Sequence, residues 1–194
     1  EGGSGDNQGS GGSGNNQGTG GQTNGQGLKY YDKNKGITII ISNIQRKEAV
    51  LTGVDNKHAK GKLTVPDTLK VKGTTYKLTA IGKNAFKNQK QLKEVVIGRN
   101  IQTIGDNAFY KCTKLQKVTI PSKVSKIGKS AFYGCKKLKN ITIRSKKLTS
   151  KNVGSKAFKG IHSKATIKVP KNRFSAYKKM LKSKGVGTKM RIKK

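Results

Sequence analysis

The sequence predicts a solenoid made mainly of β-strands, with one helix near its end that places it among α+β folds. The first observation is an internal repeat, because residues 104–121 and 127–144 are identical at ten of eighteen aligned positions, at an offset of 23. The second is that two aliphatic residues alternate with polar ones near the end of each copy, as in a β-strand. A short period with one strand per unit is typical of stacked coils.

Four copies of the repeat align without a gap on a phenylalanine. These phenylalanines are Phe86, Phe109, Phe132 and Phe158, each directly preceded by an alanine. An aliphatic residue lies five positions before each one, and a glycine follows it: Ile81–Gly82, Ile104–Gly105, Ile127–Gly128 and Val153–Gly154. The strand pairs are Val95/Ile97, Val118/Ile120, Ile141/Ile143 and Ile167/Val169. The alternation predicts that each pair faces the core and that the residues between them point outward.

Three positions of the repeat have a clear physical purpose. Each phenylalanine would fill the space between successive coils, and burying one contributes about 1.5–3 kcal/mol. The glycine fits either a turn that needs a positive φ or a close approach of two backbones. Pro121 and Pro170 come directly after their strands, where a missing amide donor does least harm. Pro66 has the same place after "LTV", which indicates a degenerate extra unit over 63–80.

The pattern I-G-x-x-A-F-x-x-C-x-x-L-x-x-V-x-I-P resembles the BspA-type leucine-rich repeat of bacterial cell-surface proteins. The resemblance covers 81–170 closely and implies an array with an N-terminal β cap and a C-terminal capping helix. Because members of this family are mostly surface or secreted proteins, several of them implicated in adhesion, it also implies a binding module without a particular ligand. Two departures from the pattern indicate that the array is ending. Unit three has three extra residues between Arg144 and Val153, and unit four has Ile161 and Lys164 in place of the Cys and the Leu.

The flanks complete the predicted domain organisation. Residues 1–27 contain twelve glycines and no hydrophobic residue, so we expect a disordered Gly-rich linker with another domain upstream of it. Residues 28–194 form the leucine-rich repeat domain: 28–80 an N-terminal β cap and degenerate unit, 81–170 four repeats, 171–194 a C-terminal helical cap. In that cap, Phe174, Tyr177 and Leu181 define one apolar helix face that Gly185 ends, followed by a short strand around 190–192.

The charge points to the class of partner. Residues 28–194 hold all 43 Lys and Arg and six acids, a net charge of +37. The charge indicates either a solvated, aggregation-resistant surface or a polyanionic partner approached by long-range attraction. Arginine, which suits specific phosphate and base recognition, contributes five of the 43, so we do not expect nucleic acid. No apolar run reaches 18 residues, so no membrane insertion is expected.

No residue pattern predicts catalysis, a metal or a cofactor. Cys112 and Cys135 occupy the same repeat position, where buried packing is favoured over a disulfide or redox pair. His58 and His162 lie far apart in the sequence and outside any catalytic signature. The acids Asp32, Glu48, Asp55, Asp67, Glu94 and Asp106 form no evident acid–base pair. Tyr110 and Tyr133, one repeat apart, are expected to pack over the neighbouring phenylalanines rather than to stack on bases.

The outward strand positions are the candidate binding residues: Glu94, Val96, Lys117, Thr119, Asn140, Thr142, Thr166 and Lys168. They are either a ligand face or merely solvated strand positions. We expect a secreted or bacterial cell-surface, monomeric, non-enzymatic binding, adhesion or spacer module whose partner is an anionic wall polymer or acidic glycan. The alternatives are an adhesin that binds a host protein and an accessory domain of an upstream enzyme.

Overall fold

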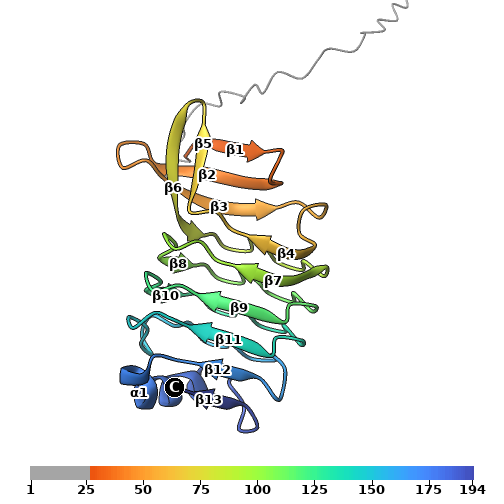
Figure 1. Cartoon of the computed structure of the whole chain (residues 1–194), viewed down its shortest axis with the longest axis vertical. Helices are drawn as coiled ribbons and strands as arrows, with labels where there is room; N and C mark the ends of the chain where they lie inside the picture. The colour runs from red at the N-terminus through yellow and green to blue at the C-terminus, as the bar shows by residue number, and fades with distance from the viewer. Residues whose placement is uncertain (1–26) are drawn as a thin grey trace, which may run out of the picture.

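The computed structural model describes residues 27–194, in which stacked coils form a solenoid with one sheet on each of two sides (Figure 1). The prediction of a linker falls almost wholly on residues 1–26, outside the described residues. The predicted fold class, a mainly β solenoid with an N-terminal β cap and a C-terminal helix, is confirmed. The array runs from the β-strands of the cap to α1 (Figure 1).

The first sheet has six strands, ordered β13-β12-β11-β9-β7-β4, and all its pairings are parallel. Its strands are β4 (Gly61–Thr64), β7 (Leu92–Val96), β9 (Lys117–Ile120), β11 (Asn140–Ile143), β12 (Thr166–Lys168) and β13 (Arg191–Lys193). The predicted inward pairs are buried throughout, from Val95 and Ile97 to Ile167 and Val169. The period of two therefore sets which face of this sheet the core covers.

The second sheet has seven strands and is mixed. Its strands are β1 (Lys29–Asp32), β2 (Ile37–Asn43), β3 (Glu48–Val54), β5 (Thr68–Val71), β6 (Thr74–Ile81), β8 (Thr103–Ile104) and β10 (Lys126–Ile127). β1, β2 and β3 pair antiparallel as an N-terminal meander, and β5 pairs antiparallel with β6. From β3 through β6, β8 and β10 the pairing is parallel, so the meander is continuous with the coils.

Four stacked phenylalanine rings run through the core. Consecutive ring centroids from Phe86 to Phe158 are 4.8, 5.1 and 5.5 Å apart, with the ring planes within 9° of parallel. Cys112 and Cys135 are free thiols buried beside this stack. Cys112 donates to the carbonyl of Phe86 at 2.9 Å, and Cys135 to that of Phe109 at 3.1 Å. The two cysteines therefore pack as small core residues, as the sequence favoured.

The repeat glycines serve close approach and not a positive φ. Gly82, Gly105, Gly128 and Gly154 have ordinary φ values, but a Cβ on Gly105 would lie 2.7 Å from backbone atoms of the coil before it. The left-handed residues of the repeat lie instead two positions before and two positions after each phenylalanine. Those before it are Asn84, Asn107, Ser130 and Lys156, with φ between 53° and 61°, and those after it are Asn88, Lys111, Gly134 and Gly160, with φ between 54° and 75°. Of the two roles that the sequence left open for the glycine, the structure shows the second.

α1 (Phe174–Ser183) follows a 3-10 turn, η1 (Lys171–Arg173), and buries Tyr177, Met180 and Leu181. No helix among residues 27–194 is long and apolar enough to cross a membrane. In each coil the amide of the phenylalanine donates to the alanine carbonyl of the next coil, as from Phe132 to Ala157 at 2.8 Å. At the end of the array Phe158 donates instead to Lys184 at 3.0 Å, directly after α1. The helix thus occupies the place of a fifth coil.

Candidate binding surface

The eight predicted site residues lie on the outward face of the six-stranded sheet, in two parallel files. The strand register places Glu94, Lys117, Asn140 and Thr166 in one file and Val96, Thr119, Thr142 and Lys168 in the other. All eight are half-buried or exposed. The repeat brings them together because each equivalent residue pairs directly with the one in the next coil. We call these two files the outer ladder.

The register extends the outer ladder by one strand at each end, beyond what the sequence reasoning included. On β4, Lys62 stands opposite Glu94 and Thr64 opposite Val96. On β13, Arg191 stands opposite Thr166 and Lys193 opposite Lys168. The sequence carried a signal for β4, because Lys62-Leu63-Thr64-Val65 has the alternation of Lys117-Val118-Thr119-Ile120. β13 matches the short strand predicted around 190–192, but the segment has no repeat motif that could have placed it on the ladder.

A shallow hollow of about 340 Å³ lies on the outer ladder across β9, β11 and β12. Its polar lining residues are Lys117, Lys168, Asn140, Thr142 and Thr166. Glu94, the acid of the ladder, lies 3.3 Å from the Lys117 ammonium and neutralises part of its charge. Lys168 therefore carries the less compensated charge at this hollow. Such a lining can donate several hydrogen bonds to an oxyanion or to sugar hydroxyls.

Positive charge is concentrated in the C-terminal half of the chain. Residues 107–194 contain 27 Lys and Arg and no Asp or Glu, whereas residues 28–106 contain 16 cations and all six acids. Four ion pairs form among residues 27–194, and Lys35 and Lys117 are the lysines in them. Among residues 27–194, therefore, no lysine after residue 117 takes part in an ion pair. A field of one sign attracts counter-charged polymers over the Debye length, about 8 Å at physiological salt.

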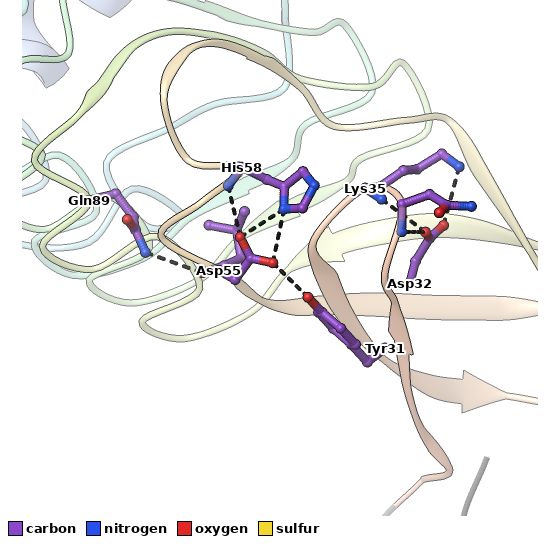
Figure 2. A network of polar contacts seen from close by, with 8 residues as sticks. Tyr31, Asp32, Lys35, Asp55, His58 and Gln89 are labelled. Carbon is purple, nitrogen blue, oxygen red and sulfur yellow. Dashed lines mark hydrogen bonds and ion pairs between the residues drawn. The ribbon is translucent and has the colours of Figure 1, made fainter. Parts of the chain in front are cut away.

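A polar network joins two turns of the N-terminal cap (Figure 2). The Asp55 carboxylate accepts hydrogen bonds from the Tyr31 hydroxyl at 2.6 Å and from the His58 amide at 2.8 Å, and it lies 2.9 Å from His58 Nδ1. The imidazole of His58 lies against the backbone of Gly36 in the β1–β2 turn. Sequence reasoning did not pair these residues, although Asp55 and His58 have the i, i+3 spacing of a side chain that caps its own turn.

This network has the groups of an acid–base pair without a nucleophile. The hydroxyl of Tyr31, followed by the amide and imidazole of His58, holds the pKa of Asp55 far below its ordinary value. The same bond raises the pKa of Tyr31. No serine, threonine or cysteine is hydrogen-bonded to His58 in the part of the chain that the structure describes. The arrangement therefore fastens β1 to the turn after β3.

Replacing Tyr31 by phenylalanine should destabilise the cap in a pH-dependent way. Because the pKa of Asp55 is lowered on folding, its contribution to stability is complete above the unfolded pKa, about 3.9, and is lost progressively as the pH falls from there through the much lower folded pKa. The difference between the denaturation midpoints of wild type and Tyr31→Phe should therefore be full at pH 6 and smaller at pH 3. Urea denaturation at both pH values measures this. A difference that stays constant with pH would contradict the role of the carboxylate.

The remaining candidate residues do not form a reactive cluster. A hydrogen bond with the neighbouring Cys112 thiol, together with burial, raises the pKa of the Cys135 thiol well above its ordinary value. Cys135 is therefore a poor nucleophile. His162 lies before β12, where its Nδ1 accepts a hydrogen bond from the Lys164 amide at 3.1 Å. In residues 27–194 no three His, Cys, Asp or Glu side chains group so as to hold a metal ion. Tyr110 and Tyr133 stack on each other, with centroids 5.2 Å apart.

Comparison with solved structures finds the same fold in bacterial proteins. A leucine rich cell surface protein from Faecalibacterium prausnitzii A2-165 is 29% identical, with a TM-score of 0.57 over 74% of this chain and 37% of that one. A leucine-rich repeat protein from Bacteroides ovatus is 28% identical, with a TM-score of 0.59 over 69% and 35%. A third, from Bacteroides capillosus, is 20% identical, with a TM-score of 0.56 over 82% and 96%. The chain thus spans just over a third of the first two.

A comparison with curated proteins gives no match. The family model described as a BspA type leucine rich repeat region matches six copies between residues 70 and 185, which is more than half of the chain. The matched region includes the phenylalanine stack, the repeat glycines and the outward strands from β7 to β12. This match and the solved structures agree with the motif read from the sequence. The chain therefore belongs to the family of BspA-type leucine-rich repeat proteins.

Proposed function

We propose that the chain is a non-enzymatic, extracellular binding module of the bacterial cell surface, and that its outer ladder binds an anionic polymer. Membership of the leucine-rich repeat family supports a binding or adhesion role. The name of the F. prausnitzii relative, a cell surface protein, supports the location. The observation that carries the choice of ligand is the acid-free half of the chain, which contains the hollow on β9, β11 and β12.

The mechanism follows from the lysine geometry. Long-range attraction brings the polymer to the positive half, and the ammonium groups at the hollow then pair with its carboxylates or phosphates. Lysine is a hydrated point charge on a flexible stem, so it accepts many anion spacings, and it suits wall polymers or acidic glycans of irregular structure. Successive coils present equivalent positions along the ladder, so one polymer can contact several of them, and weak contacts add up.

Reversing two ladder charges should weaken polymer binding about tenfold or more. Lys168 and Lys193 stand opposite each other on β12 and β13, so exchanging both for glutamate keeps a like-charged pair and should change folding little. A matched control is the double exchange of Lys29 and Lys70, exposed strand lysines of β1 and β5 that stand opposite uncharged residues, which gives the same change in net charge. Binding to teichoic acid and to an acidic glycan is measured by calorimetry for both variants and the wild type.

Salt separates the two candidate ligand classes. If charge drives binding, affinity for the polymer should collapse by about 0.5 M salt, where the screening length is a few Å. A protein ligand is the second candidate, because the middle of the ladder is uncharged at Val96, Thr119 and Thr142. Binding to a protein through this stripe would survive at high salt. Equal losses in the ladder variant and its control would contradict a localised site and leave only general charge attraction.

A further inference from the structure

A second concave site lies at the C-terminal end of the solenoid, away from the outer ladder. It is a cleft of about 400 Å³ between the segment 148–150 and α1. Its polar lining consists of Thr149, Ser150, Arg173, Lys179 and Ser183. Leu148, Ala176 and Met180 form its apolar part. Because two basic and three hydroxyl-bearing residues line this space and the last 88 residues contain no acid, the cleft has the chemistry of an anion site with room for the rest of a sugar-sized ligand.

The extra residues of the third repeat build one wall of this cleft. The Tyr177 hydroxyl, buried on α1, donates to the carbonyl of Ser145 at 2.9 Å and accepts from the amide of Leu148 at 3.0 Å. Asn152 accepts from the amide of Thr149 at 2.7 Å and donates to the carbonyl of Lys147 at 3.0 Å. These bonds fix the wall against the helix. A wall held in this way needs little ordering when a ligand binds.

Arg173 supplies the observation that points to an anion. Its Nε is buried and has no hydrogen-bond partner, and no other buried side-chain nitrogen or oxygen in residues 27–194 lacks one. Its guanidinium lies 5.9 Å from the centre of the Tyr177 ring, which holds the group in place. Because Nε is not accessible from the cleft, an oxyanion would bind the terminal nitrogens of the same guanidinium, which forms no ion pair with a carboxylate among residues 27–194. Arginine can bind carboxylate and phosphate alike with two parallel hydrogen bonds.

We propose that this cleft binds a single oxyanion-bearing unit of sugar size, either a carboxylate sugar or a phosphate ester. Arg173 holds the oxyanion, and Lys179 adds a second positive charge. The hydroxyls of Thr149, Ser150 and Ser183 bind the rest of the sugar-sized unit, and the apolar residues of the cleft contact its carbon atoms. This site is distinct from the outer ladder, which lies on the strands, so either site can exist without the other. The cleft recognises one unit of a polymer, whereas the ladder follows its length.

The test uses the full chain with four probes: glucuronate, glycerol phosphate, inorganic phosphate and neutral glucose. Binding is followed by the NMR signal of the Arg173 Nε–H, which shifts when the terminal nitrogens of the guanidinium bind an oxyanion. We expect saturable shifts with glucuronate or glycerol phosphate, weaker ones with inorganic phosphate, and none with glucose. A preference between the first two tells which oxyanion the cleft selects. Absence of a saturable shift with either charged probe would overturn the proposal.

Three variants distinguish binding in the cleft from general charge attraction. Arg173→Gln removes the guanidinium, and Ala176→Phe fills the cleft from an exposed helix position without a change of charge. Each should weaken binding of the preferred probe at least tenfold by calorimetry. Arg144→Gln removes the same charge from an exposed turn outside the cleft and should change it less than twofold. Equal losses of affinity in Arg144→Gln and Arg173→Gln would overturn the proposal, and so would unchanged affinity in Ala176→Phe. Neither result bears on polymer binding to the outer ladder.

Discussion

Replacing Phe109 by alanine should lower the free energy of unfolding by about 3–5 kcal/mol, as large-to-small changes of aromatic core residues do. Phe109 is fully buried between two other rings, with centroids 4.8 Å from Phe86 and 5.1 Å from Phe132. Its removal opens a cavity between two coils and breaks the stack in the middle. Because each coil contacts only its neighbours, the interfaces on both sides are weakened together. Urea denaturation followed by circular dichroism measures the loss.

Two further alanine variants test whether the position in the stack sets the size of this effect. Phe158 is the last ring and has one aromatic neighbour in the stack, Phe132 at 5.5 Å, so its loss should cost less than that of Phe109. Phe174 begins α1, is only partly buried and lies outside the stack, and its loss should cost least. A similar cost at all three positions would show that the stack adds nothing beyond the burial of each ring.

The core could be predicted because a repeated residue has one structural role that is copied. Each repeat phenylalanine and each inward strand pair was assigned to the interior from the repeat pattern alone, and these residues are buried. The left-handed backbone could not be assigned in the same way. It occurs at two positions of each repeat, and the one before the phenylalanine, at Asn84, Asn107, Ser130 and Lys156, has no common residue type. Asparagine tolerates this conformation better than lysine does, but two asparagines in four copies do not make a pattern.

The candidate sites differ in the same way, because one is formed by repeated residues and the other is not. The outer ladder was predictable because parallel pairing without register shifts puts equivalent residues of the repeats side by side, as in Lys117 opposite Asn140. The cleft at Arg173 was not, because it forms between an insertion and a helix that have no counterpart in the other repeats. Nor was the contact of Tyr31 with Asp55, which joins residues 24 positions apart across the cap. Periodicity predicts what repeats, and these contacts occur only once.

Replacing Gly128 by alanine should destabilise the array by about 1–3 kcal/mol or more, the cost of overpacking a tight contact. A Cβ on Gly128 would clash with the backbone of Gly105 and Asp106 in the preceding coil. That backbone has little freedom to move, because the Gly105 amide donates to Ile81 at 2.7 Å and the Gly128 amide to Ile104 at 2.7 Å. The expected loss is read from the urea midpoint.

The equivalent glycines provide a graded control for this argument. A Cβ on Gly82 would meet the carbonyl oxygen of Leu51 in the cap at 3.1 Å, so Gly82→Ala should cost less than Gly128→Ala. On Gly53, the nearest atom outside its neighbours is 3.8 Å away, so Gly53→Ala should change stability little. If all three variants lose the same stability, the loss comes from the backbone preference of glycine. A loss that grows from Gly53 through Gly82 to Gly128 shows that the spacing between coils leaves no room for a side chain.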